Sequence, residues 1–271
     1  MFSLLWHEIK SRRNAIIGWG IGLTFFGLMY TTIYPQVQEE MAGLADLAIY
    51  QAMGIEIATF EGYFGSTVIG FVPVLLGVYA VLTATTALAG EEDNGTLELL
   101  LTSRMKRWEI VMAKALGLMG VMGIILVITG ISYVFGFTLV MDQIETEVTQ
   151  GAVFVVVFSA LPLVWVFVAL GLFLGTVTPT RKTAMGIGLV VLIASYFMEN
   201  LGSMLAELEF VQSLSLFTYF NSSSTVFAEG VAMGDMVLLL VLTGVFLGLA
   251  VVGFQRRDVT VGQWPWQKVR V

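Results

Sequence analysis

The chain has 271 residues, of which 57% are hydrophobic and only 12% are charged, and its mean hydropathy is +0.88. A soluble domain is about 25% charged, so this composition excludes an ordinary soluble protein and requires lipid as the solvent. The sequence has no cysteine and one histidine, His7, which excludes disulfides and thiolate metal sites and leaves little room for a histidine metal cluster.

The first predicted element is an amphipathic helix over residues 1–13. Its apolar positions recur at helical spacing and are Phe2, Leu5, Trp6 and Ile9. Its other face is polar and carries Ser3, His7, Lys10 and Asn14. Such a helix suits the lipid headgroup region, with its tryptophan at the interface. The alternative is an ordinary helical lead-in to the first span, anchored by the same tryptophan.

Six apolar stretches are long enough to cross a membrane. A transmembrane helix needs about 20 residues, because each adds about 1.5 Å against a hydrocarbon core about 30 Å thick. The predicted spans are 14–34, 64–90, 110–141, 151–177, 183–198 and 236–254. Lys114 is the only charged residue within them, and we expect it to snorkel to the nearby interface. The sequence therefore predicts an all-α integral membrane protein with one domain over residues 1–271, whose first span is a retained anchor.

The basic residues fix the predicted orientation. The net charge of −7 hides a strong asymmetry, because six spans place all 13 lysines and arginines on the side of the N-terminus. The loops on the other side carry only acids, such as Glu39, Glu145 and Glu207. Positive residues accumulate in cytoplasmic loops, so we expect a multi-pass protein with both termini in the cytoplasm.

The loop after the second span, residues 91–109, has an unusual charge pattern. The acids at its start, which suit the positive end of a helix dipole, are Glu91, Glu92 and Asp93. An apolar stripe follows at helical spacing and consists of Leu97, Leu100 and Leu101. A short cytoplasmic helix with such a stripe would bury it in the membrane surface or in a partner protein. A solvated turn that returns the chain to the bilayer is the alternative.

This loop closely resembles the coupling-loop signature of type-2 ABC transporter permeases. The signature has a pair of acids, then G-T-L-E, a leucine run, an arginine–glutamate pair and a lysine at the start of the next helix. The matching positions are Glu91, Glu92, Gly95, Thr96, Leu97, Glu98, Leu99, Leu100, Leu101, Arg107, Glu109 and Lys114. Arg104 departs from the pattern, because proline is frequent there. The tail Gly253–Val259 also resembles a common ending in this family, although a stop-transfer basic pair would look the same.

The resemblance implies a function that the residues alone do not. The loop would be a coupling helix that docks on a separate ABC ATPase subunit. Two permease chains, alike or different, would pair with two ATPase chains in the plasma membrane of a prokaryote, with the first and fifth spans near the permease interface. ATP and magnesium would bind the partner, since this chain has no G-x-x-x-x-G-K-[ST] loop. No cofactor, metal, nucleic acid or catalysis is expected of the chain itself.

The outer segment 199–235 is too long for a turn and too apolar for a solvated loop. Its aromatic residues are Phe210, Phe217, Tyr219, Phe220 and Phe227. The resemblance implies short helices that re-enter the membrane. Such non-spanning backbone is stable inside a membrane only where protein or water shields its polar groups from lipid. A surface-lying amphipathic hairpin is the alternative.

The leading hypothesis is therefore the permease subunit of an exporter. The polar residues of the spans are few and weak, and they are Thr83, Thr85, Thr86, Thr129, Ser132, Tyr133, Ser159 and Ser195. A path lined this way suits a hydrophobic or amphipathic substrate, unless these residues serve only helix packing. An ion-coupled secondary transporter or channel would need charges or broken helices within the membrane. A non-transporting anchor subunit would not need the leucine stripe.

Overall fold

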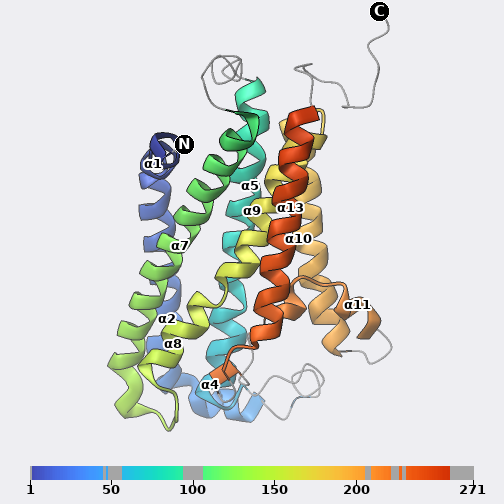
Figure 1. Ribbon diagram of the computed structural model, residues 1–271. Helices are drawn as coiled ribbons and strands as arrows, with labels where there is room; N and C mark the ends of the chain where they lie inside the picture. The colour runs from blue at the N-terminus through green and yellow to red at the C-terminus, as the bar shows by residue number, and fades with distance from the viewer. Residues whose placement is uncertain are drawn as a thin grey trace, which may run out of the picture.

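The computed structural model describes residues 2–44, 47, 57–93, 106–204, 209–220, 226–227 and 230–256. Within these ranges six helices are long and apolar enough to cross a membrane: Arg13–Leu44, Phe60–Leu88, Arg107–Gln143, Gln150–Val177, Arg181–Ser203 and Met233–Arg256. The predicted all-α class and the six spans are confirmed. The start of the first helix and the end of the last lie at the same end of the bundle (Figure 1). We call this the basic end, because the described lysines and arginines lie there, and the opposite end the acidic end.

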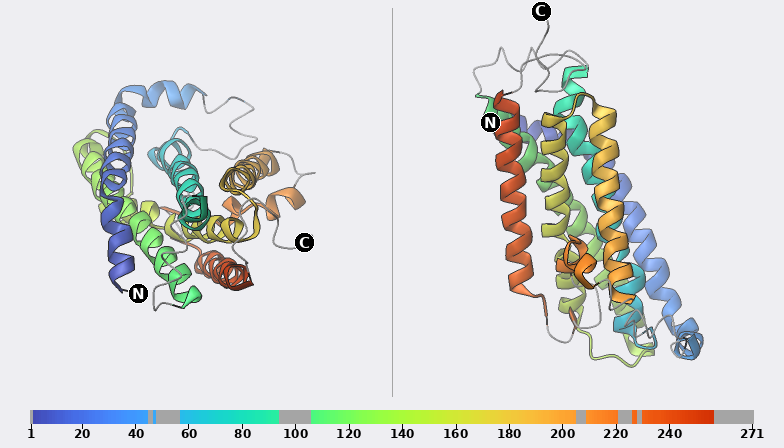
Figure 2. Two further views of the ribbon diagram at one scale, coloured as in Figure 1. Left: turned by 90° about the horizontal axis from the view of Figure 1, so that it is seen from above. Right: turned by 90° about the vertical axis from the view of Figure 1, so that its right-hand side faces the viewer.

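Helix α1 (Phe2–Ser11) is separate from the first span and lies across the basic end (Figure 2). Helix α2 (Arg13–Leu44) runs ten residues past the predicted end of the first span and contains Pro35. Proline lacks the N–H of an interior helix bond and clashes with the preceding turn, so it bends a helix. The part of α2 after Pro35 accordingly turns across the acidic end (Figure 1).

The second span consists of three consecutive helical segments: α4 (Phe60–Phe64), the π-helical η1 (Gly65–Ile69) and α5 (Phe71–Asp93). It therefore extends at both ends beyond the predicted 64–90. The acids Glu91, Glu92 and Asp93 form the last turn of α5 instead of opening a separate helix, which corrects that part of the prediction. The helix of the second span continues without a break from its apolar part into these acids.

The third span is α7 (Arg107–Val140), which ends in a 3-10 turn, η2 (Met141–Gln143). The fourth span, Gln150–Val177, agrees with the predicted 151–177. It is broken at Ser159 and Ala160 into α8 (Gln150–Phe158) and α9 (Leu161–Val177). Pro162 lies in the first turn of α9, where its missing N–H needs no partner, so it favours a fresh helix start over a continuous helix.

The fifth span, α10 (Arg181–Met204), is longer than the predicted 183–198. The predicted stretch has fewer residues than a membrane crossing needs, and the observed helix has enough. The chain then returns through α11 (Glu209–Ser213) and η4 (Phe217–Tyr219) to the last span, α13 (Met233–Arg256). The returning segment packs against α10. Phe217 is buried between the rings of Phe167 on α9 and Tyr196 on α10.

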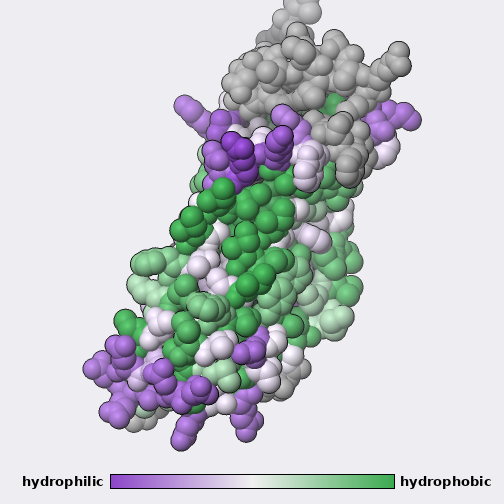
Figure 3. All heavy atoms as spheres, turned by 90° about the vertical axis from the view of Figure 1, so that its left-hand side faces the viewer, coloured by the Kyte–Doolittle hydropathy of each residue, from purple (hydrophilic) through white to green (hydrophobic). Residues whose placement is uncertain are grey.

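The helices pack around α7 and α9. Helix α2 lies mainly on α7, whereas α5 and α13 both lie on α9. Small residues admit the closest crossings: a Cβ on Gly171 of α9 would lie 2.8 Å from the Cβ of Ala84 on α5. On the outer surface of the bundle, an apolar belt separates two polar bands (Figure 3). This distribution is the one that a bilayer demands of its protein.

Candidate functional site

The candidate site is the basic end around the start of α7, where the loop of residues 94–105 ends. Most of the predicted coupling residues, Gly95 to Leu101, lie outside the described residues, and so does Arg104. Glu91 and Glu92 belong to the last turn of α5. Arg107, Glu109 and Lys114 are described, and each is bound to another part of the chain.

Glu109 caps the first turn of α7. Its Oε2 accepts a hydrogen bond from the backbone N–H of Lys106 at 2.8 Å. A helix start leaves its first N–H groups without partners and favours negative charge, so the carboxylate satisfies both needs. The first turn of α7 is thereby fixed at the exit of the loop.

Arg107 ties the same turn to the end of the last span. Its Nη1 donates to the backbone carbonyls of Phe254 at 3.3 Å and Gln255 at 3.2 Å. These carbonyls belong to the last turn of α13, where unpaired C=O groups favour a cation. Arg107 therefore joins the first turn of α7 to the last turn of α13.

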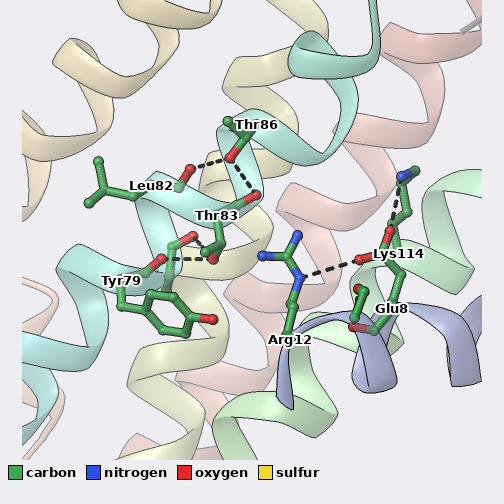
Figure 4. A network of polar contacts seen from close by, with 9 residues as sticks. Glu8, Arg12, Tyr79, Leu82, Thr83, Thr86 and Lys114 are labelled. Carbon is green, nitrogen blue, oxygen red and sulfur yellow. Dashed lines mark hydrogen bonds and ion pairs between the residues drawn. The ribbon is translucent and has the colours of Figure 1, made fainter. Parts of the chain in front are cut away.

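Lys114 does not snorkel, contrary to the prediction. It is 1% exposed, and its Nζ lies 3.1 Å from Oε1 of Glu8 on α1. The other carboxylate oxygen of Glu8 accepts a hydrogen bond from Nε of Arg12 at 3.3 Å. Figure 4 shows the three side chains converging between α1, α5 and α7. Helix α1 therefore covers Lys114 at the start of α7.

The carboxyl group of Glu8 is held in its charged form. Burial alone would raise its pKa, but the Lys114 ammonium and the Arg12 guanidinium outweigh burial, and the pKa lies below its ordinary value. A buried carboxylate is tolerated only when it is paired and hydrogen-bonded. The pair therefore fastens α1 to α7.

Two glycines of α7 make room for this contact. A Cβ on Gly117 would lie 2.7 Å from the Cβ of Glu8, and one on Gly120 would lie 3.4 Å from Cδ1 of Ile9. The face of α1 that packs on α7 therefore includes Glu8 and differs from the predicted apolar face. Trp6 of the predicted face is 59% exposed, as an interfacial anchor requires.

Glu8 and Arg12 are the residues that sequence reasoning missed. Leu5, Glu8, Ile9 and Arg12 stand at i, i+3, i+4 and i+7, so they share one helix face. A carboxylate with an arginine four residues later, on a face that also carries leucine and isoleucine, was the available signal. It pointed to a packed and paired face instead of a purely lipid-facing one.

The weakly polar span residues mostly serve their own helices. Thr85 donates to the carbonyl of Val81 at 2.7 Å and Thr129 to that of Ile125 at 2.8 Å, and both threonines are fully buried. Ser195 joins the returning segment through Ser215, with the two hydroxyl oxygens 3.2 Å apart. Thr83 and Thr86 also donate to carbonyls of their own helix, those of Tyr79 and Leu82, and both remain half-buried on the face of α5 near Arg12 (Figure 4).

The fold defines a six-span, all-α integral membrane protein whose contacts at the basic end join the start of the third span to α1 and α13. Residues 2–259 match the family model of the ABC-2 family transporter proteins, and the chain belongs to this family. Its members are membrane subunits that normally work with an ABC ATPase. The comparison with curated proteins gave no match.

Proposed function

We propose that the chain is the permease subunit of an ATP-driven exporter, moved by a separate ATPase that docks on residues 91–109. The observation that carries the proposal is the anchoring of α7 directly after this loop. Glu109 caps α7, Arg107 joins it to α13, and Lys114 joins it to α1. A displacement of the loop by the ATPase would thus be passed to three helices at once.

The energy source in this proposal is ATP with magnesium on the ATPase. ATP binding would shift the equilibrium between inward-open and outward-open states only through contacts that differ between the two. The loop supplies such contacts if its leucine stripe docks on the ATPase. Two copies of each subunit, with the basic end in the cytoplasm of a prokaryotic cell, complete the proposed assembly.

An export substrate of hydrophobic or amphipathic character fits the spans best. Among the described residues, Lys114 is the only buried charged residue of a span, and Glu8 holds it near the basic end. The broken fourth span is a feature that a secondary transporter would also have. A secondary transporter would also need an acid or base near the middle of a span to bind a coupling ion or to titrate, and the described part of the spans has none there.

The proposal is tested at the leucine stripe. Burying one leucine side chain contributes about 1.5–3 kcal/mol, so Leu97→Asp with Leu101→Asp should weaken docking by roughly a hundredfold or more. The ATPase should no longer co-purify, or should hydrolyse ATP without transport. Leu97→Met with Leu101→Met is the matched control and should retain both. Normal ATPase recovery together with normal transport in the aspartate variant would refute the coupling role.

A further inference from the structure

A polar site lies between α1 and α5 that the coupling contacts do not use. Arg12, in the turn between α1 and α2, directs its guanidinium toward Tyr79 and Thr83 of α5 (Figure 4). Its Nε is bound to Glu8, whose other oxygen is bound to Lys114. Apart from Glu8, the described group with which the guanidinium interacts is the hydroxyl of Tyr79, so most of the four N–H donors on its two terminal nitrogens are left for a ligand.

Tyr79 adds a second unused group at the same place. Tyr79 is 8% exposed, and its buried hydroxyl makes no hydrogen bond of normal geometry to a described residue, although it lies close enough to interact with the Arg12 guanidinium. The ring packs at a tilt against Trp19 of α2, with ring centroids 5.3 Å apart. A buried hydroxyl without a normal hydrogen bond is energetically unfavourable. This cost is removed when an acceptor enters beside it.

An apolar track leads away from this polar site along α5. It consists of half-buried or exposed side chains on one helix face: Phe71, Leu75, Val78 and Leu82. From Leu82 to Phe71 the helix rises about 16 Å, which is close to the depth of one leaflet of the hydrocarbon core. Thr83 and Thr86 separate the track from the guanidinium (Figure 4).

We propose that Arg12 and Tyr79 bind the anionic headgroup, a phosphate or carboxylate, of the amphiphile that the transporter carries, while its chain lies along the α5 track. The proposal deepens the proposed function, on which it rests, by naming an anionic amphiphile as the substrate class. Guanidinium N–H groups in a partly dehydrated place bind such oxygens strongly. The side chain of Arg12 is 21% exposed, so a headgroup can reach it.

The test is lipid binding by the purified permease alone, which needs no ATPase. Bromine-labelled phosphatidylglycerol and phosphatidylcholine with identical chains are titrated in a nonionic detergent, and quenching of tryptophan fluorescence is measured. Trp19, which lies beside Tyr79, should be quenched when lipid binds at this site. The Trp19→Phe variant shows how much of the total quenching comes from Trp19. The wild-type protein should prefer phosphatidylglycerol roughly tenfold or more. Arg12→Gln should lose this preference, and Arg12→Lys, which keeps the charge beside Glu8, should retain most of it.

Arg13→Gln is the matched control, because it removes the same charge from an exposed neighbour. It should leave the preference within about twofold. Equal losses in the Arg12 and Arg13 variants, or no preference in the wild-type protein, would overturn the site. In the complex with its ATPase, phosphatidylglycerol should raise ATP hydrolysis in the wild-type protein and not in Arg12→Gln. Site-specific binding without any change in hydrolysis would assign the site to a resident lipid and overturn the substrate assignment. Failure of an ATPase to co-purify would instead count against the proposed function and leave the binding result standing.

Discussion

Gly27 of α2 lies directly against the ring of Tyr133 on α7, and a Cβ at position 27 would overlap that ring. Tyr133 is fully buried, and its hydroxyl has no partner among the described residues. The contact therefore depends on the missing side chain of Gly27. It helps to hold the two longest helices of the described chain together.

Gly27→Ala should destabilise the protein, because the ring of Tyr133 must leave its rotamer or the helices must separate. Overpacking of this kind costs about 1–3 kcal/mol. Gly22→Ala is the matched control on the same helix, since a Cβ there meets nothing within 4 Å. Thermal unfolding in detergent should show a lower midpoint for Gly27→Ala alone. Equal midpoints for the two variants would show that the helices are looser than described.

Lys114→Met should also lower stability, since it leaves the Glu8 carboxylate buried with Arg12 as its remaining described partner. Removing one member of a buried ion pair costs about 3–5 kcal/mol. The exposed Lys182→Met removes the same charge and should have little effect. The comparison uses unfolding midpoints of the two variants in one detergent. A midpoint for Lys114→Met as high as that of Lys182→Met would contradict the contribution assigned to the pair.

The Glu8 pair also predicts a pH dependence with a definite sign. The folded pKa of Glu8 lies below its ordinary value, so its contribution is fully present above the unfolded pKa of about 4.3. The contribution is lost as the pH falls through the folded pKa. Glu8→Gln should therefore be clearly less stable than the wild-type protein at pH 7. The difference should narrow on acidification below pH 4.3, and a constant difference would exclude a titrating pair.

Topology can be tested with single cysteines, because the natural chain has none. Cysteines at Glu40 and Glu145, both exposed at the acidic end, should react with an impermeant reagent in intact cells. Cysteines at Lys106 and Lys182, exposed at the basic end, should react only after the cells are opened. Labelling of position 106 from outside would reverse the orientation that the positive residues predict.

Pairing of two permease chains is expected to use the open face of α2. Gly171 and Gly175 form a G-x-x-x-G pair on α9, where Gly171 is already in contact with α5, whereas the pair Gly18 and Gly22 on α2 faces open space within the chain. Close helix crossings need such small residues, so Gly18→Leu with Gly22→Leu should reduce dimers in cross-linked native membranes. The equally open Gly244 and Gly248 of α13 provide the matched control pair. Unchanged dimers in the α2 variant would move the interface elsewhere.

The six spans were predictable because hydrocarbon imposes their length and composition, and the alternation of charges showed that their number is even. The break at Ser159 was not, although Pro162 was visible, because many prolines only bend a membrane helix. The continuation of α2 past Pro35 was missed because a proline can also end a helix, and the predicted span stopped at residue 34. Whether a proline bends, interrupts or ends a helix depends on the residues packed around it, and the local sequence does not show which residues these are.

The site was predictable only in part. The sequence placed Arg107, Glu109 and Lys114 at the start of the third span, but their partners come from distant segments. Glu8 and Lys114 are 106 positions apart, so only the folded chain shows that α1 covers the lysine. The resemblance identified the loop, whereas the anchoring contacts around it required the structure.

The pairing of Glu8 with Lys114 has a consequence for how the protein is made. The ribosome completes α1 more than one hundred residues before it reaches Lys114, so Glu8 enters the membrane surface with Arg12 as its nearest cation. Until the third span has been inserted, a charged Glu8 cannot leave the hydrated headgroup layer. The first helix therefore cannot dock on α7 until the third span has been inserted.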